Sequence, residues 1–196
     1  MHFAAQERRW EILEFLVNNR YEGCTTSAMN HAAGGGNLDM VKLLHKNLSV
    51  CCSSKPIDMA AANGYVHIVK WLHENRIEGC SKKAMDSAAA HGHLEVVRFL
   101  HSHRSEGCTK RAMDKAILNG HFAVVKFLHE NRAEGYDSNA LDRADMTIIT
   151  PSLRRIIQYL APDRPLDYVS QVERSRMYSI YGPKDNDNSS DDEGPY

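Results

Sequence analysis

The sequence has no long hydrophobic run. None of its apolar stretches approaches the length of about 18 residues that a membrane-spanning helix needs. The N-terminal segment MHFAAQERRW contains no hydrophobic stretch long enough for a secretory signal. Both absences argue against an embedded or secreted protein. We therefore expect an intracellular protein, with the cytoplasm preferred and the nucleus left open.

The chain also lacks an excess of charge of either sign. It carries 24 Lys and Arg against 25 Asp and Glu, a net charge of −1. This balance provides no general attraction to nucleic acid or to an anionic membrane, and we expect neither as a partner. The charge is unevenly distributed, because residues 182–196 are rich in acids and leave the rest of the chain mildly basic.

Two further absences limit the chemistry. Five cysteines are an odd number, in a chain of 196 residues that is large enough to bury a core without disulfides, so a reducing compartment fits better. The sequence contains no glycine-rich phosphate loop, no serine or cysteine nucleophile motif and no isolated pair of carboxylates. We expect a protein that is not an enzyme and has no cofactor.

The sequence does contain an internal repeat of 28 residues. Cys24, Cys52, Cys80 and Cys108 follow this step, and Tyr136 occupies the next place. One unit reads CSKKAMDSAAAHGHLEVVRFLHSHRSEG, and the complete units are 24–51, 52–79, 80–107 and 108–135. The same step relates a column of histidines and a column of glycines: His45, His73, His101, His129, and Gly36, Gly64, Gly92, Gly120. Such a period is typical of a repeat protein.

Each unit predicts two short helices. Apolar residues recur at helical spacing in both halves, and Gly92 or its equivalent provides the turn between them. The glycine at the end of each unit, such as Gly79, is expected to end the second helix in a left-handed conformation. The second residue of every unit has an N-cap side chain: Thr25, Ser53, Ser81, Thr109 and Asp137. Helices this short need neighbours on both sides, which predicts an all-α solenoid.

The segment AMDSAAAHGHLEVVRFL resembles the ankyrin repeat, whose signature is T-P-L-H-x-A followed by A-x-x-G-H and an apolar helix. The resemblance extends over residues 8–161, and Pro56 retains the signature proline. It implies an ankyrin-like helical-repeat solenoid that binds proteins.

Two departures from the family matter. The ankyrin repeat has about 33 residues, so the unit here is shorter, and the loss falls after the second helix, where the family has a projecting hairpin. We therefore expect shortened inter-repeat loops. The signature histidine is also replaced, so its bond across the loop must be different or absent. The residues in its place are Asn30, Asp58, Asp86, Asp114 and Asp142.

The ends of the array are irregular. We expect residues 1–23 to form a partial repeat and residues 24–135 to form four complete repeats. Residues 136–181 are expected to form a divergent capping repeat with a short extension, and residues 182–196 an acidic disordered tail. Whether Ser189 or Ser190 in this tail is phosphorylated is left open. Trp10, Ile12 and Phe15 resemble interior residues. Either residues 1–9 cover them, or the chain is a fragment of a longer array.

The cysteine and histidine columns are interpreted as packing positions. Equivalent residues in adjacent repeats lie roughly 8–10 Å apart, too far for a disulfide or for a shared metal ion. Redox or metal chemistry remains a minor alternative. His93 and His121, which follow the turn glycine, are expected to brace that turn through hydrogen bonds.

The charges on the first helices allow two interpretations. Lys55, the pair Lys82-Lys83 and the pair Lys110-Arg111 form a basic row, and the aspartates named above form an acidic row. The rows could be a solvated face with pairs such as Lys83–Asp86 and Arg111–Asp114, or a concave binding face.

We expect a non-catalytic, monomeric scaffold or adaptor that binds a protein partner through the first helices. The alternative is a structural spacer, or a fragment of a larger ankyrin protein without its effector domain. The expected contact residues are Lys55, Met59, Lys83, Ser87, His91, Arg111, Lys115 and Asn119.

Overall fold

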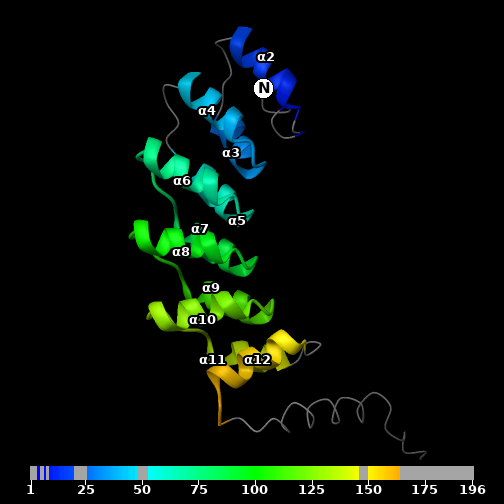
Figure 1. Ribbon diagram of the computed structural model, residues 1–196, viewed down its shortest axis with the longest axis vertical. Coiled ribbons are helices and arrows are strands. Elements are labelled where there is room, and N and C mark those ends of the chain that lie inside the picture. Colours follow the sequence, from blue (N-terminus) through cyan, green and yellow to red (C-terminus); the bar gives the residue numbers. More distant parts are fainter. Residues whose placement is uncertain are drawn as a thin grey trace, which may run out of the picture.

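The computed structural model describes residues 4, 7, 9–19, 26–47, 53–145 and 150–163, which form a stack of short helices without a strand. Figure 1 shows successive helix pairs layered in sequence order along one axis. The helices are α2 (Trp10–Asn19), α3 (Thr26–Gly34), α4 (Leu38–Asn47), α5 (Lys55–Ala62), α6 (Val66–Asn75), α7 (Lys82–Ala90), α8 (Leu94–His103), α9 (Lys110–Leu118), α10 (Phe122–Asn131), α11 (Ser138–Asp145) and α12 (Pro151–Leu160). The expected all-α repeat solenoid is confirmed.

The first helices α7 and α9 begin at the predicted caps. The Ser81 hydroxyl accepts a hydrogen bond from the Lys83 amide, and the Thr109 hydroxyl accepts one from the Arg111 amide, both at 3.2 Å. In α5 the N-cap is Ser54 and not the predicted Ser53, although the Ser53 hydroxyl still accepts from the Lys55 amide at 3.2 Å. These bonds satisfy an amide that the first turn of the helix leaves without a partner. Thr25, the cap predicted for the first complete repeat, lies outside the described residues.

Each second helix ends earlier than predicted. α6 ends at Asn75, and its C-cap Arg76 is extended, with φ −139°. Gly79 does have a left-handed φ of +74°, but it lies within the loop and not at the helix end. The prediction that this glycine and its equivalents end the helix is therefore wrong. The extended Arg76 instead begins a loop in which it forms an ion pair with Glu78.

Small residues set how the repeats stack. Ala60, Ala61, Ala88 and Ala89 of the first helices have no solvent exposure. The first helices α3, α5, α7 and α9 consequently pack more closely on one another than the second helices do, since the latter are separated by larger aliphatic and aromatic side chains. The first-helix side is therefore the more tightly packed side of the stack.

The two ends of the stack differ. At the N-terminal end, Trp10 is partly buried against Gly35, but Ile12 and Phe15 are 53% and 65% exposed. The exposure of Ile12 and Phe15 contradicts the first alternative, that the N-terminal residues cover these side chains, and α2 turns its Val17 side toward the core. At the other end, α12 packs on α10 and buries Ile156 completely.

Some expectations concern residues that the structure does not describe. They include the replacement of the glycine turn around 148–149, the helix expected within 166–181 and the acidic tail 182–196. In the described part, no helix combines the length and the apolar character required to span a bilayer.

Candidate interaction surface

The acidic row joins consecutive repeats. Asp86 accepts hydrogen bonds from the amide and the hydroxyl of Thr109, both at 2.7 Å. Asp58 does the same with Ser81, at 2.8 and 2.7 Å. Asp114 accepts from the Asp137 amide at 2.8 Å. The aspartates thus replace the brace of the missing signature histidine, and the expectation that this brace differs is confirmed.

The bonds of the aspartates contradict the predicted ion pairs between the basic and the acidic row. The predicted pairs Lys83–Asp86 and Arg111–Asp114 are not among the ion pairs of the described residues. The carboxylate oxygens instead bind partly buried donors of the next repeat, where a hydrogen bond is stabilised more than an exposed ion pair would be. The acidic row is therefore a structural seam and not half of a binding face.

The basic row has no acidic partners among the described residues. Its five side chains are exposed, and none of them forms an ion pair in the part of the chain that the structure describes. They lie in the first turn of α5, α7 or α9, on consecutive layers of the stack. They are Lys55, Lys82, Lys83, Lys110 and Arg111. Lys115, in the last turn of α9, is likewise exposed and belongs to none of the ion pairs described.

The remaining expected contact residues have mixed environments. Met59 and Ser87 are half-buried, and His91 and Asn119 are exposed. Asn119 donates from Nδ2 to the carbonyl of Ala90 in the preceding repeat at 2.6 Å. The His91 ring contacts the Ser87 carbonyl through Nδ1 at 2.8 Å. Asn119 is therefore partly committed to a joint between repeats, whereas Lys83, Arg111 and Lys115 are not.

A second joint, which was not predicted from the sequence, lies in the loops. Arg104 forms an ion pair with Glu106, and Glu106 Oε1 accepts from the Cys80 amide of the preceding loop at 3.2 Å. The Arg104 guanidinium lies so close to Gly79 that a Cβ added there would clash with Nη2. The same ion pair recurs as Arg76–Glu78 and Arg132–Glu134. The recurring R-x-E-G of the loops was the available signal.

This joint controls the ionisation of Glu106. Its partial burial alone would raise the pKa, but hydrogen bonds from Arg104 and from the Glu106 and Cys80 amides outweigh that effect, and the pKa falls to about 2. The carboxylate is stabilised in its charged form because donors converge on it. The Arg–Glu pairs therefore act as charged braces between loops.

The histidine column packs against aromatic rings of the next repeat. His45, His73 and His101 each meet a ring edge to face, with ring centroids 5.2 to 5.5 Å apart. In addition, Arg104 Nη1 lies 3.3 Å from His73 Nδ1. The rings that they meet are Trp71, Phe99 and Phe127. Such contacts stabilise the stack, and the packing interpretation of these three histidines is confirmed. No group of three or more potential metal ligands occurs among the described residues.

The described cysteines are poor nucleophiles. Cys108 is buried, and Cys80 is half-buried in the equivalent position one repeat earlier. Burial, together with the nearby Glu134, raises the pKa of the Cys108 thiol to about 11, and burial with Glu106 raises the pKa of Cys80 equally. Since the thiolate is the reactive form, both residues serve packing, as predicted. Cys24, Cys51 and Cys52 lie outside the described residues.

His93 and His121 brace a turn, but not their own. The His93 ring covers Gly64 of the preceding repeat so closely that a Cβ there would be 2.6 Å from Nδ1. His121 covers Gly92 in the same way. Burial lowers the pKa of His93, with His91 as a further cause. The prediction is corrected accordingly: these histidines are another contact between repeats.

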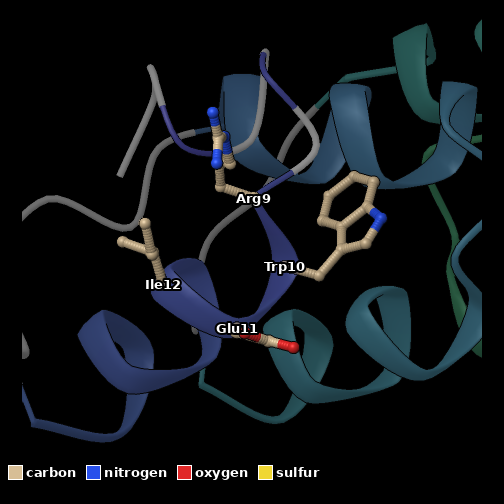
Figure 2. A pocket seen from close by; sticks show the side chains of 4 residues that line it. All are labelled: Arg9, Trp10, Glu11 and Ile12. Atoms are coloured by element: carbon tan, nitrogen blue, oxygen red, sulfur yellow. The ribbon is translucent and has the colours of Figure 1, made fainter.

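One pocket of about 290 Å³ lies beside α2 and is lined by Arg9, Trp10, Glu11 and Ile12. Figure 2 shows the Trp10 and Ile12 side chains pointing to opposite sides of the helix. The four side chains do not converge on one point where a substrate could react. This pocket therefore has no arrangement typical of general acid–base or nucleophilic catalysis.

The stacked helix pairs and the side-chain joints between them define a helical-repeat array. Family models described as ankyrin repeats match residues 85–129 and residues 1–86. The chain therefore belongs to the ankyrin repeat family. Ankyrin repeats are generally modules for protein–protein interaction. No curated protein matches the sequence significantly.

Proposed function

We propose that this protein is a non-catalytic scaffold that binds a protein partner through the first helices on the concave side. One observation carries the proposal: the aspartates and the loop Arg–Glu pairs, which recur from unit to unit, are used in joints, whereas the exposed first-helix cations Lys55, Lys83, Arg111 and Lys115 are not. Ser87 and Lys115 occupy the same place in successive repeats, and so do Lys83 and Arg111. These side chains are under little structural demand, so they are available for a partner.

The contact surface in this proposal includes Lys55, Met59, Lys83, Ser87, His91, Arg111, Lys115 and Asn119. It extends over the repeats within 24–135, with divergent units on both sides. We further propose that the protein acts as a monomer inside the cell. The described loops between repeats, at 76–81, 104–109 and 132–137, are short and contain no hairpin, which supports binding through helix faces.

A structural spacer role is the second candidate. The observation that favours it is the exposure of Ile12 and Phe15 on α2, at one end of the stack. Large apolar side chains at such an end are suited to stacking against a further element. In that case the concave surface would have no partner of its own.

Affinity capture from cells that express the protein tests the proposal. The bait would be compared with a surface variant, Lys83→Ala/Ser87→Arg/Lys115→Ala, and with a matched control on the second helices, Lys42→Ala/Lys46→Ala/Ser102→Arg. All six positions are exposed or half-exposed on helices. We expect proteins captured by the wild type and the control to be lost from the surface variant, with unchanged circular dichroism. Capture of the same proteins by all three baits would overturn the proposal.

A further inference from the structure

We propose that the concave surface recognises an extended acidic segment of its partner, with a carboxylate at every third residue. The three cations that would align it are Lys55, Lys83 and Arg111, at equivalent positions of three consecutive repeats. This inference rests on the proposed function and specifies the chemistry of the partner. Three independent features of the described residues support it.

The first feature is that the cations form no ion pair with any described residue, although they lie beside acids that are already engaged. Both carboxylate oxygens of Asp86 face Thr109, with Oδ1 on the amide and Oδ2 on the hydroxyl. Asp58 is bound in the same way by Ser81. These aspartates lie one helical turn from Lys83 and Lys55, yet their hydrogen bonds direct them across the seam to the next repeat. Exposed cations that lack a partner can then pair with carboxylates of another molecule.

The second feature is the position of the cations on their helices. Lys55, Lys82 and Lys110 are the first residues of α5, α7 and α9. The N-terminal end of a helix has a partial positive charge, so a cation there is less favourable than an acid. The sequence repeats this locally unfavourable choice in three consecutive units. Departures from a local rule without a structural gain are expected at functional sites. Here the charges of the cations and the partial positive charges of the helix N-termini combine into one positively charged strip along the stack.

The third feature is the spacing. Adjacent packed helices are roughly 8–10 Å apart, which sets the distance between equivalent cations of the column. A polyproline II segment returns to the same face at every third residue, after about 9.3 Å. A β-strand returns after two residues, about 6.6 Å, and does not stay in register with the repeats. A Glu-x-x-Glu-x-x-Glu segment in the polyproline II conformation therefore matches Lys55, Lys83 and Arg111.

An acidic peptide fits this surface better than nucleic acid does. The helices α5, α7 and α9 contain no aromatic residue on which a base could stack. The aspartates of the seam lie next to the basic column, and they would disfavour the dense charge of a phosphate backbone. A peptide with widely spaced carboxylates avoids this repulsion.

The test measures fluorescence anisotropy of labelled peptides with the full chain. The probe GEPAEPAEG has a glutamate at every third position. It is compared with a peptide of the same composition that has adjacent glutamates, with a glutamine version, and with single-stranded oligothymidylate. We expect the probe to bind about tenfold more tightly than the glutamine version and several-fold more tightly than the clustered one, and to weaken with salt. Equal binding of the glutamine or clustered peptide, or tighter binding of the oligonucleotide, would overturn the inference.

A matched pair of variants separates recognition from folding. Lys83→Gln/Arg111→Gln should weaken binding of the probe about tenfold and leave the melting temperature unchanged or higher, because it removes cations from helix N-termini. Lys42→Gln/Lys46→Gln, on α4, removes the same charge and should bind like the wild type. Unchanged binding by the first variant contradicts the inference.

The two proposals can fail separately. If none of the peptides binds, but captured proteins are still lost from the Lys83/Ser87/Lys115 surface variant, only the acidic character of the partner is wrong. If capture is also indifferent to the surface variant, the proposed function fails together with the inference.

Discussion

Thr109 donates both its backbone amide and its hydroxyl to Asp86 of the preceding repeat, each at 2.7 Å. The same hydroxyl accepts from the Arg111 amide and thereby caps α9. One residue thus starts a helix and fastens it to the helix before it. This double use couples the formation of each first helix to the stacking of its repeat, which a solenoid of marginal helices requires.

Loss of the Asp86 brace should destabilise the array. Asp86→Ala leaves the Thr109 amide and hydroxyl without their acceptor, and we expect a loss of about 2–3 kcal/mol in the free energy of unfolding. The measurement is guanidinium unfolding followed by circular dichroism. Glu74→Ala removes an exposed helical acid without a comparable brace and should change stability by less than about 0.5 kcal/mol. Equal effects of the two substitutions would contradict a bracing role for Asp86.

The turn glycines should differ in their tolerance of alanine. Gly92 has φ +78°, and an added Cβ would lie 2.6 Å from His121 Nδ1. Gly120 has φ +73°, but its nearest neighbour, Ser152 Cβ, would be at 3.5 Å. Both alanine variants incur the cost of a left-handed residue, about 1–2 kcal/mol, and only Gly92→Ala adds a clash. We expect a lower melting temperature for Gly92→Ala than for Gly120→Ala, and equal values would refute the contact with His121.

The Arg–Glu joints of the loops should make the free energy of unfolding depend on pH in the acidic range. The pKa of Glu106 is lowered to about 2, so its stabilising contribution is complete above its ordinary pKa near 4.5 and is lost as the pH falls toward 2. Solvent screening limits this contribution to about 1 kcal/mol. Urea unfolding at several pH values should show the difference between wild type and Glu106→Gln shrinking from pH 7 to pH 2.5. Glu95→Gln, at an exposed position, provides the control, and its difference should vary less.

The histidine–aromatic contacts should be energetically coupled. His101 and Phe127 meet edge to face at 88°, with centroids 5.4 Å apart. A double-mutant cycle of His101→Leu and Phe127→Leu should give a coupling energy of about 0.5–1.5 kcal/mol. Phe127→Leu also disturbs the contact of Phe127 with Arg98. This contribution cancels in the cycle, because the free-energy change of Phe127→Leu is measured both with His101 present and in the His101→Leu variant. His73 and Phe127 are not in contact with each other in these ring pairs, so a cycle between them should give no coupling energy.

The Cys108 thiol should be protected from alkylation. Its pKa of about 11, together with its burial, lowers the thiolate fraction near neutral pH. In a variant that retains only Cys108, iodoacetamide should react about 100-fold more slowly with the folded than with the urea-unfolded protein at pH 7.5. A folded rate close to the unfolded rate would show that the seam around Cys108 is open.

The repeat unit was predictable because its signals are local. The caps Ser81 and Thr109, the turn at Gly92 and the helical spacing of alanines and valines each act within a few residues, and the structure has helices where these signals place them. The end of α6 at Asn75 was predicted incorrectly. A glycine such as Gly79 has the same left-handed signature in a loop as at a helix end, so its sequence does not distinguish the two.

The joints between repeats were largely hidden from the sequence. An aspartate three residues after a lysine on a helix favours a local ion pair, and Lys83–Asp86 is therefore one of the two interpretations that the sequence allows. The alternative partner, Thr109, is 23 residues further on and becomes available only when the next repeat stacks. The Arg104–Glu106 pair was missed for a similar reason, since its contact with Cys80 and Gly79 depends on the preceding loop.

The sequence by itself determined the period, the helix pairs and the membership in a repeat family, because these depend on short-range propensities and on a pattern that recurs many times. Only the tertiary structure decided which charges are engaged. Packing buries the seam between repeats, and a carboxylate near partly buried amide and hydroxyl donors is stabilised more than in an exposed ion pair. The aspartates are therefore drawn into the seam, and Lys83 and Arg111 of the first helices have no acidic partner among the described residues.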